Sequence, residues 1–368
     1  MVPAVLALLL LLVAPAPQEA AERQARLNQI RASLFSGTGS PDAAIRELKD
    51  ILAVDPGSAE GHMLLGVAYR VAAQPEFMGE AVAELRQALA ISPTFVPARV
   101  YLAHIYMDLG RNERAREELE AALAQVPKNA QVLALLGEVE RQLKNPTRSL
   151  DVLTQAIQID EGSAQAHYYR GLTLLDLGRS ADAIAELERV VKAGEKRADV
   201  YLSLGAAYLE AKRLDEGLEI LSQATHLDPA RPDIRIQLAR AYRLQGKLAQ
   251  AKAQLAVAAP KGPESVASPF VQQRQVEFDL YFEQGVLDAQ LGQLTAAATA
   301  FRKVLDMDPE HGPANNHMAD VCLRQGQYAK ALEYATKAEK LGVPLSSAKR
   351  KQLQDKLQAI GKQPEGRP

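Results

Sequence analysis

Residues 198–229 read ADVYLSLGAAYLEAKRLDEGLEILSQATHLDP, and this stretch decides the fold. It holds one glycine at 205, a second glycine at 217 and a proline at 229. Each of the three positions recurs along the chain at a spacing of 34 residues or a multiple of 34. A period of this length indicates an array of small supersecondary units. The recurring residues are Ala103, Gly137, Gly171, Gly205 and Ala239; Ala81, Ala115, Ser149, Ala183, Gly217 and Ala251; and Pro93, Pro127, Pro229 and Pro263.

Two short patterns identify the repeat. The first is a Leu-Gly pair followed by a tyrosine, as in Leu204-Gly205 with Tyr208, and the second is a small residue followed by a large one, as in Ala183 with Leu187. The array resembles the tetratricopeptide repeat (TPR) family, whose 34-residue unit is a helix–turn–helix. The resemblance implies an all-α TPR solenoid, a right-handed superhelix, with about nine repeats and a C-terminal capping helix. We name the two helices of each repeat the A helix and the B helix.

Sterics explain the recurring small residues and glycines. A residue without bulk is needed where the two helices of a repeat cross closely, because a larger side chain would force them apart. Glycines between the two helices are expected to take a left-handed conformation at the end of the A helix. These turn glycines are Gly110, Gly178, Gly246, Gly292 and Gly326.

The periodicity also predicts the boundaries. The TPR array is expected to span 21–343, with repeats starting near 25, 59, 96, 130, 164, 198, 232, 278 and 312. Three extra residues are expected near 74–77, and twelve extra residues are expected to form a loop over 260–269 and a longer A helix from Phe270. Residues 344–368 are expected to form a capping helix over 345–360 and a flexible tail.

The N-terminus has the pattern of a targeting segment. Residues 1–17 carry no charged side chain, 4–14 are an unbroken apolar run, and Ala14-Pro15-Ala16 has the small-x-small spacing of a cleavage site. The run is too short to cross a bilayer, which takes about 17 to 25 residues. Residues 1–20 are therefore expected to be a signal peptide and the mature protein to be periplasmic or secreted. The alternatives are cleavage near Ala20 and an uncleaved anchor, with 1–17 as the membrane contact.

The composition argues against several classes of protein. The chain has 43 Lys and Arg against 45 Asp and Glu. A general nucleic-acid binder needs a basic surplus, so no nucleic-acid partner is expected. With 47% hydrophobic residues the chain is not a disordered one. Its single cysteine rules out an internal disulfide and a CxxC motif.

The sequence contains no recognisable catalytic or metal-binding motif. HExxH, GxxxxGK[ST] and GxSxG are all absent, and the six-residue spacing of His311 and His317 does not place them on one helical face. Cys322 stands where other repeats carry a tyrosine, so we expect a packed apolar thiol. The repeats and the cap use residues 25–360 and leave no room for a catalytic domain. No enzyme activity, cofactor, metal or small-molecule substrate is expected.

The resemblance also implies where a partner binds. In TPR proteins the A helices line the concave face of the superhelix, and peptides or partner helices bind there. Family geometry assigns the second, fifth, ninth and twelfth residues of each repeat to this surface, which we name the A-helix face. The carboxylate clamp of chaperone-binding members is expected to be missing, because its lysine and asparagine positions are mostly apolar in this sequence.

The middle of the A-helix face is apolar over three repeats. An exposed apolar patch of this size usually marks a binding site, so we expect it to hold an amphipathic helix or an extended peptide of a partner. Two arginines beside it are expected to orient an acidic or C-terminal group. The alternative is that neighbouring A helices bury these side chains themselves. The residues are Tyr168, Leu172, Leu175, Leu202, Leu209 and Ile236, with the arginines Arg240 and Arg243.

The sequence thus favours an exported, non-enzymatic scaffold that binds a protein or peptide partner. Export together with a bare TPR array resembles proteins of secretion, of pilus or envelope assembly, and of polysaccharide export. One alternative is a cytoplasmic or membrane-anchored co-chaperone or regulator. Another is a structural protein that assembles with itself through its exposed repeat ends.

Overall fold

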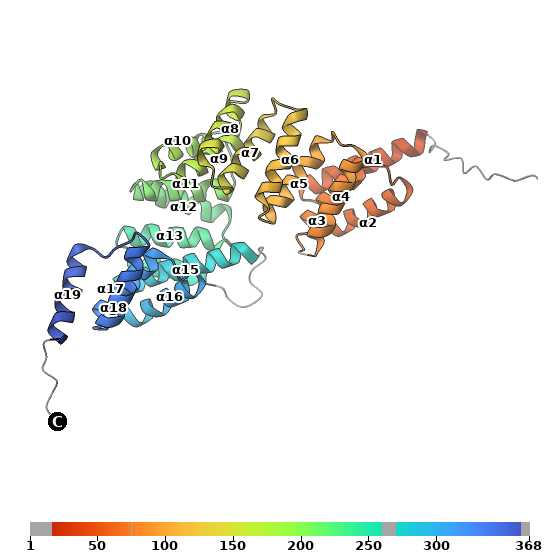
Figure 1. Cartoon of the computed structure of the whole chain (residues 1–368). Helices are drawn as coiled ribbons and strands as arrows, with labels where there is room; N and C mark the ends of the chain where they lie inside the picture. The colour runs from red at the N-terminus through yellow and green to blue at the C-terminus, as the bar shows by residue number, and fades with distance from the viewer. Residues whose placement is uncertain (1–16, 75, 260–269, 362–368) are drawn as a thin grey trace, which may run out of the picture. The chain divides into compact units, whose positions relative to one another are not determined.

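A computed structural model of the chain describes residues 17–74, 76–259 and 270–361. These residues form nineteen helices and no strand, and the helices make nine successive A–B pairs and a final helix (Figure 1). The expected all-α repeat array is therefore confirmed. The helices are α1 (Pro17–Ser36), α2 (Pro41–Val54), α3 (Ala59–Val71), α4 (Phe77–Ile91), α5 (Val96–Asp108), α6 (Asn112–Gln125), α7 (Ala130–Gln142), α8 (Pro146–Ile159), α9 (Ala164–Asp176), α10 (Ser180–Lys192), α11 (Ala198–Glu210), α12 (Leu214–Leu227), α13 (Pro232–Leu244), α14 (Leu248–Ala258), α15 (Phe270–Gln290), α16 (Leu294–Met307), α17 (Gly312–Arg324), α18 (Tyr328–Lys340) and α19 (Ser347–Gly361).

The chain divides after Leu177 into two compact units. Unit 1 contains α1–α9 and unit 2 contains α10–α19. Each unit buries its own leucines, isoleucines and alanines between successive helices. This is the expected way for a repeat to stabilise itself, because one helix pair alone cannot bury its apolar face.

The small residues lie where the two helices of a pair cross. A Cβ atom added to Gly205 would lie 2.5 Å from the Cγ atom of Leu221, and one added to Gly66 would lie 2.8 Å from that of Leu85. A Cβ atom at Gly285 would lie 2.7 Å from the ring of Phe301. These distances are too short for real contacts, so the steric reason inferred from the sequence is confirmed.

The turns between paired helices have the left-handed conformation that was expected at their glycines, and some turns have it without a glycine. The turn glycines have φ angles between 67° and 76°. Three other turns place a non-glycine residue in the same left-handed conformation: Ala73, Lys144 and Lys212. Lys144 and Lys212 each lie 34 residues after a turn glycine, so the turn geometry is kept where the glycine is lost.

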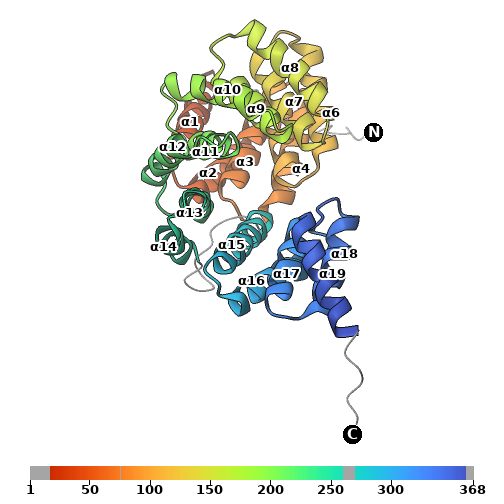
Figure 2. The ribbon, with the colours of Figure 1, turned by 90° about the vertical axis from the view of Figure 1, so that its left-hand side faces the viewer.

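The ends of the array differ slightly from the expectation. The first helix begins at Pro17 and not near residue 25. At the other end, α19 lies against α18 and buries Leu353 (Figure 2). Lys349 forms an ion pair of 2.8 Å with Asp320, and Arg350 one of 2.8 Å with Glu339. The capping helix is confirmed, and part of its basic face is used within the chain.

Three expectations fall on residues outside the described ranges. These are most of the signal peptide (1–16), the loop over 260–269 and the tail after Gly361. The long A helix does begin at Phe270, as the insertion predicted. None of the described helices has both the length and the apolar character needed to cross a bilayer.

Candidate interaction surface

The A-helix face of unit 1 has a half-buried apolar centre on α5. Val100, His104 and Met107 occupy the fifth, ninth and twelfth positions of their repeat, and all three are partly exposed. Beside them the ring of Tyr101 stacks on the exposed ring of Phe35 from α1, with centroids 6.0 Å apart. This part of the face therefore combines apolar and aromatic groups that water reaches.

His104 is held neutral at ordinary pH. Burial, helped by the nearby guanidinium of Arg70, lowers its pKa to about 4, against the opposing effect of Asp108. The imidazole thus adds an uncharged polar group to the centre of the face.

Arginines at the twelfth position link successive A helices. In unit 1 the Nε atom of Arg70 on α3 donates to Asp108 on α5 at 2.6 Å. The Nη1 atom of Arg141 on α7 donates to Asp176 on α9 at 2.7 Å. Because each pair joins one repeat to the next, these arginines fix the spacing of the A helices along the face.

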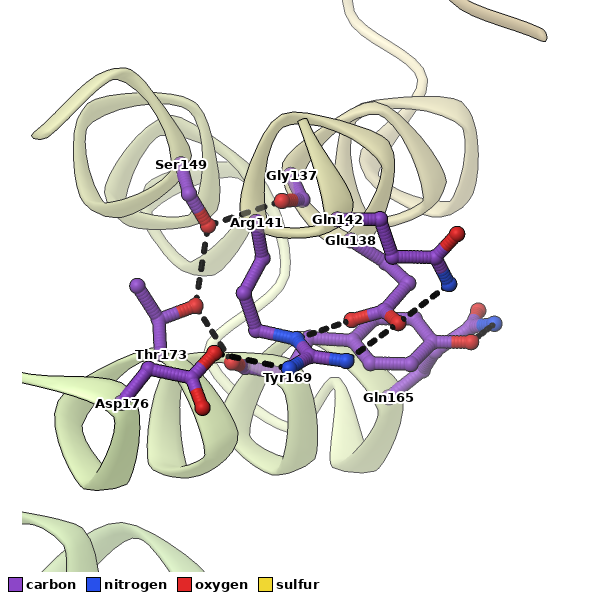
Figure 3. A network of polar contacts seen from close by, with 9 residues as sticks. All are labelled: Gly137, Glu138, Arg141, Gln142, Ser149, Gln165, Tyr169, Thr173 and Asp176. Carbon is purple, nitrogen blue, oxygen red and sulfur yellow. Dashed lines mark hydrogen bonds and ion pairs between the residues drawn. The ribbon is translucent and has the colours of Figure 1, made fainter. Parts of the chain in front are cut away.

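Figure 3 shows the second of these links in detail. Arg141 also donates from Nε and Nη2 to the buried carboxylate of Glu138, both at 2.8 Å, and Gln142 donates to the same carboxylate. Burial acts to lower the pKa of Arg141, but Glu138 and then Asp176 outweigh it and raise the pKa. The guanidinium is therefore charged and fixed by two carboxylates.

A pair of hydroxyl groups lies beside this network in the core of unit 1. Ser149 on α8 donates to the carbonyl of Gly137 at 2.7 Å and lies 2.9 Å from the hydroxyl of Thr173 on α9 (Figure 3). The single hydroxyl proton of Thr173 can be donated to Ser149 or to the carbonyl of Tyr169, which lies 2.9 Å away. The small serine at 149 thus joins three helices while it leaves room for their crossing.

The predicted apolar strip is only partly exposed. In unit 1, Tyr168, Leu172 and Leu175 are half-buried on α9. In unit 2, Leu202 is half-buried on α11 and packs on the cluster that contains Leu209.

Two members of the strip belong to the core of unit 2. Leu209 is 4% exposed and Ile236 is 2% exposed. The expectation that these two lie on an open surface is therefore wrong. Leu209 packs with Leu221 and Leu238, so for these residues the alternative of burial within the array holds.

The two arginines of the predicted strip differ in their surroundings. The Nε atom of Arg243 donates to Glu283 on α15 at 2.9 Å, and both side chains are almost buried. Arg240 lies 3.8 Å from the same carboxylate and is more exposed. Arg243 is therefore neutralised within the chain, which the sequence did not reveal because Glu283 follows it by 40 residues across the insertion.

The described residues offer no group of three or more His, Cys, Asp or Glu side chains able to hold a metal ion. Cys322 is buried in the α15–α19 core, and burial raises the pKa of its thiol. This agrees with the packed thiol expected from the tyrosine position.

Sequence reasoning missed a recurring contact at the fourth position of the A helices. Arg99 donates to the carbonyl of Pro93, in the turn before its helix, and Arg235 does the same to Pro229. Each also reaches a polar side chain on its own B helix. Other repeats use different residue types for the bond to the turn: His62, His167 and Asn315.

The chain is similar to known proteins in sequence and in fold. The sequence matches two family profiles described as tetratricopeptide repeat, one over residues 31–94, 168–232 and 282–342 and the other over 78–139 and 208–268. A search among curated proteins found no significant match.

Solved structures show the same fold. A chain of the APC/C hetero-tetramer Cut9–Hcn1 is similar with a TM-score of 0.67 and 14% identity, covering 86% of this chain and 59% of that chain. A tetratricopeptide repeat protein from Parabacteroides merdae is similar with a TM-score of 0.54 and 13% identity, covering 71% of this chain and 99% of that one. This chain thus spans less than two thirds of the Cut9–Hcn1 chain. At these identities the likeness concerns the fold alone.

Proposed function

This chain belongs to the tetratricopeptide repeat family, and we propose that it binds a segment of a partner protein on its A-helix face, in the cell envelope. The family is a protein–protein interaction scaffold, so the general role follows from membership. The place of binding and the cellular location are the parts that need a test, because one fold serves many functions.

The observation that carries the proposal is a set of half-exposed apolar side chains at positions of the A-helix face in each unit. In unit 1 the exposed groups lie on α5 and α9, and Met107 and Leu172 are examples. In unit 2 they lie on α11 and α15, and Leu202 and Phe282 are examples. Partly exposed apolar side chains on a rigid framework suit an amphipathic or extended segment, which completes their burial.

The envelope location rests on the N-terminal sequence. The apolar run at 4–14 and the small residues at 14 and 16 support export, and the role would then lie in secretion or envelope assembly. Cell fractionation with N-terminal sequencing of the recovered protein tests this part. A mature chain that starts between residues 17 and 21 in the periplasm or medium is the expected result, and an intact chain in the cytoplasm would refute it.

A paired pull-down tests the binding face. The bait is residues 21–368, as wild type and with Leu172→Asp or Leu202→Asp. The matched controls are Ile159→Asp in unit 1 and Val257→Asp in unit 2, because both residues are exposed apolar side chains on B helices. A charge on the A-helix face is expected to abolish capture of the partner, and the same charge on a B helix is expected to leave it intact. Equal capture by all variants with matched circular dichroism would reject the A-helix face.

A further inference from the structure

Two histidines in unit 2 share an aromatic cluster that joins α15 to α17. The ring of Phe282 lies edge-on to His311 at 5.2 Å and to His317 at 5.7 Å. Phe278 makes a second edge contact with His311 at 5.0 Å. His317 stacks flat on Phe301, with centroids 5.3 Å apart and an angle of 4°. Both imidazoles therefore contact the ring of Phe282.

His311 has a second task as the N-cap of α17. Its Nδ1 atom accepts a hydrogen bond from the backbone N–H of Ala314 at 3.2 Å. The equivalent caps of three other A helices are Ser58, Asn129 and Ser163, whose oxygens do not titrate near neutral pH. An imidazolium has no free nitrogen to accept a hydrogen bond, so protonation of His311 removes this cap.

The charged groups around His311 give the imidazolium little support. Burial lowers the pKa of His311, and Asp308 is the charged group that acts against this. Asp308 already accepts from the backbone N–H of Glu310 at 3.1 Å. The neutral ring is thus the stable form in the closed cluster.

His317 has the same preference, and burial is again the main reason. Burial lowers its pKa, Asp320 raises it, and Lys349, Arg243 and His311 lower it again. Asp320 is engaged by Lys349 from α19 at 2.8 Å. The nearest carboxylate is therefore compensated, and a charge on one imidazole opposes a charge on the other.

We propose that His311 and His317 form an acid-sensitive latch that ties α15 to α17 and covers Phe282 while both rings are neutral. Protonation removes the cap of α17 and places charge on partly buried rings that are poorly solvated, so the latch opens. The contact is fully present above the pKa of a free histidine, about 6.5, and weakens as the pH falls below it.

The latch gives the A-helix face of unit 2 a pH dependence. Phe282 stands at the fifth position of its repeat, where the family exposes side chains to partners. Opening the latch would expose more of this half-buried ring and loosen the first turn of α17. The latch itself depends on the geometry of the cluster and stands whether or not the face binds a partner.

The test is a pH titration of the full chain by NMR, with the six histidines labelled in the ring. His226 is exposed on α12 and serves as a control position. We expect His311 and His317 to titrate below the pKa of a free histidine, about 6.5, and the amide of Ala314 to shift together with His311. Titration of both rings near the free value would overturn the proposal.

Two variants separate the latch from general acid sensitivity. His311→Asn supplies the cap that Asn129 supplies to α7, but it does not titrate. The acid-induced shift of the Ala314 amide should vanish in this variant, and His317 should titrate at higher pH because one opposing charge is gone. His226→Asn is the control and should change neither. If the Ala314 shift persists in His311→Asn, the latch is refuted; if that variant does not fold, the wild-type titration alone decides.

Discussion

Gly137 shows how one missing side chain sets the distance between two helices. A Cβ atom there would lie 2.7 Å from the Cδ2 atom of Leu153, whereas one at Gly79 on α4 would meet nothing within 4 Å. Gly137→Ala should therefore destabilise the protein by about 1 to 3 kcal/mol through overpacking. Gly79→Ala should stabilise it by up to about 1 kcal/mol, since alanine favours a helix. Chemical denaturation of both variants checks this, and equal effects would show that the crossing is not tight.

His104 should make the stability of unit 1 depend on pH. Its pKa is lowered to about 4 by burial and by Arg70, while a free histidine has a pKa near 6.5. Between about pH 6.5 and pH 4, His104 is protonated in the unfolded chain and neutral in the folded chain. The free energy of unfolding therefore decreases as the pH falls through this range. The loss should reach about 3 kcal/mol, and His104→Gln should reduce it when unfolding is followed between pH 7 and pH 4. A profile identical to that of wild type would mean that His104 is solvated.

Glu140 is a buried carboxylate that depends on Arg148. Its side chain is 0% exposed. The Oε1 atom lies 3.1 Å from the Nε atom of Arg148, and the Oε2 atom accepts a hydrogen bond of 3.0 Å from the Nδ2 atom of Asn145. Arg148→Met should cost about 1 to 3 kcal/mol, because the buried carboxylate keeps its bond to Asn145 but loses its charged partner. Adding Glu140→Met should recover most of this loss. If the double variant is less stable than Arg148→Met alone, Glu140 stabilises the protein through contacts other than the one with Arg148.

At the scale of elements, the turns keep their geometry even where the sequence changes. Gly246 has a φ of 76°, and Lys212 has a φ of 61° in the equivalent turn of the preceding repeat. Gly246→Ala should destabilise the protein by about 1 to 2 kcal/mol, since a Cβ atom disfavours this region. Lys212→Gly should stabilise it by a few tenths of a kcal/mol up to about 1 kcal/mol, because it relieves the same strain. Thermal melts of the two variants should move in opposite directions, and a shift in the same direction would contradict this reading of the turns.

The helices could be predicted well because their signals are local and periodic. Small residues at the helix crossings recur every 34 residues, and the turn glycines Gly110, Gly178 and Gly246 recur every 68. The fourth-position contact has no such signal. Arg99, His62 and Asn315 differ in charge and length, yet all reach the carbonyl of the preceding turn. A role shared by unlike residues leaves no pattern in a single sequence.

The candidate site could be predicted less well than the fold. Family geometry assigns residues to the A-helix face, but burial depends on the side chains of the adjacent helices. Leu209 and Ile236 are covered for this reason. Arg243 is neutralised by Glu283, which lies beyond the insertion that breaks the period. Periodicity therefore predicts where a residue lies and leaves open which neighbour covers it.

At the scale of the whole molecule, each described helix packs mainly against the helices next to it in the chain. Repeat proteins gain stability from each unit and from its interfaces with the next. The division after Leu177 gives two such stacks, each with its own part of the A-helix face. A partner can therefore be sought separately on each unit.

Site-specific photocrosslinking in cells tests the binding claim most directly. A photoreactive amino acid is placed at Met107 in unit 1 or Leu202 in unit 2, on the A-helix face, and at Ile159 or Val257 on B helices as controls. We predict a discrete crosslinked adduct from at least one A-helix position and none from the two controls. Adducts from the B-helix positions alone would contradict the account and move the partner site to the other side of the repeats.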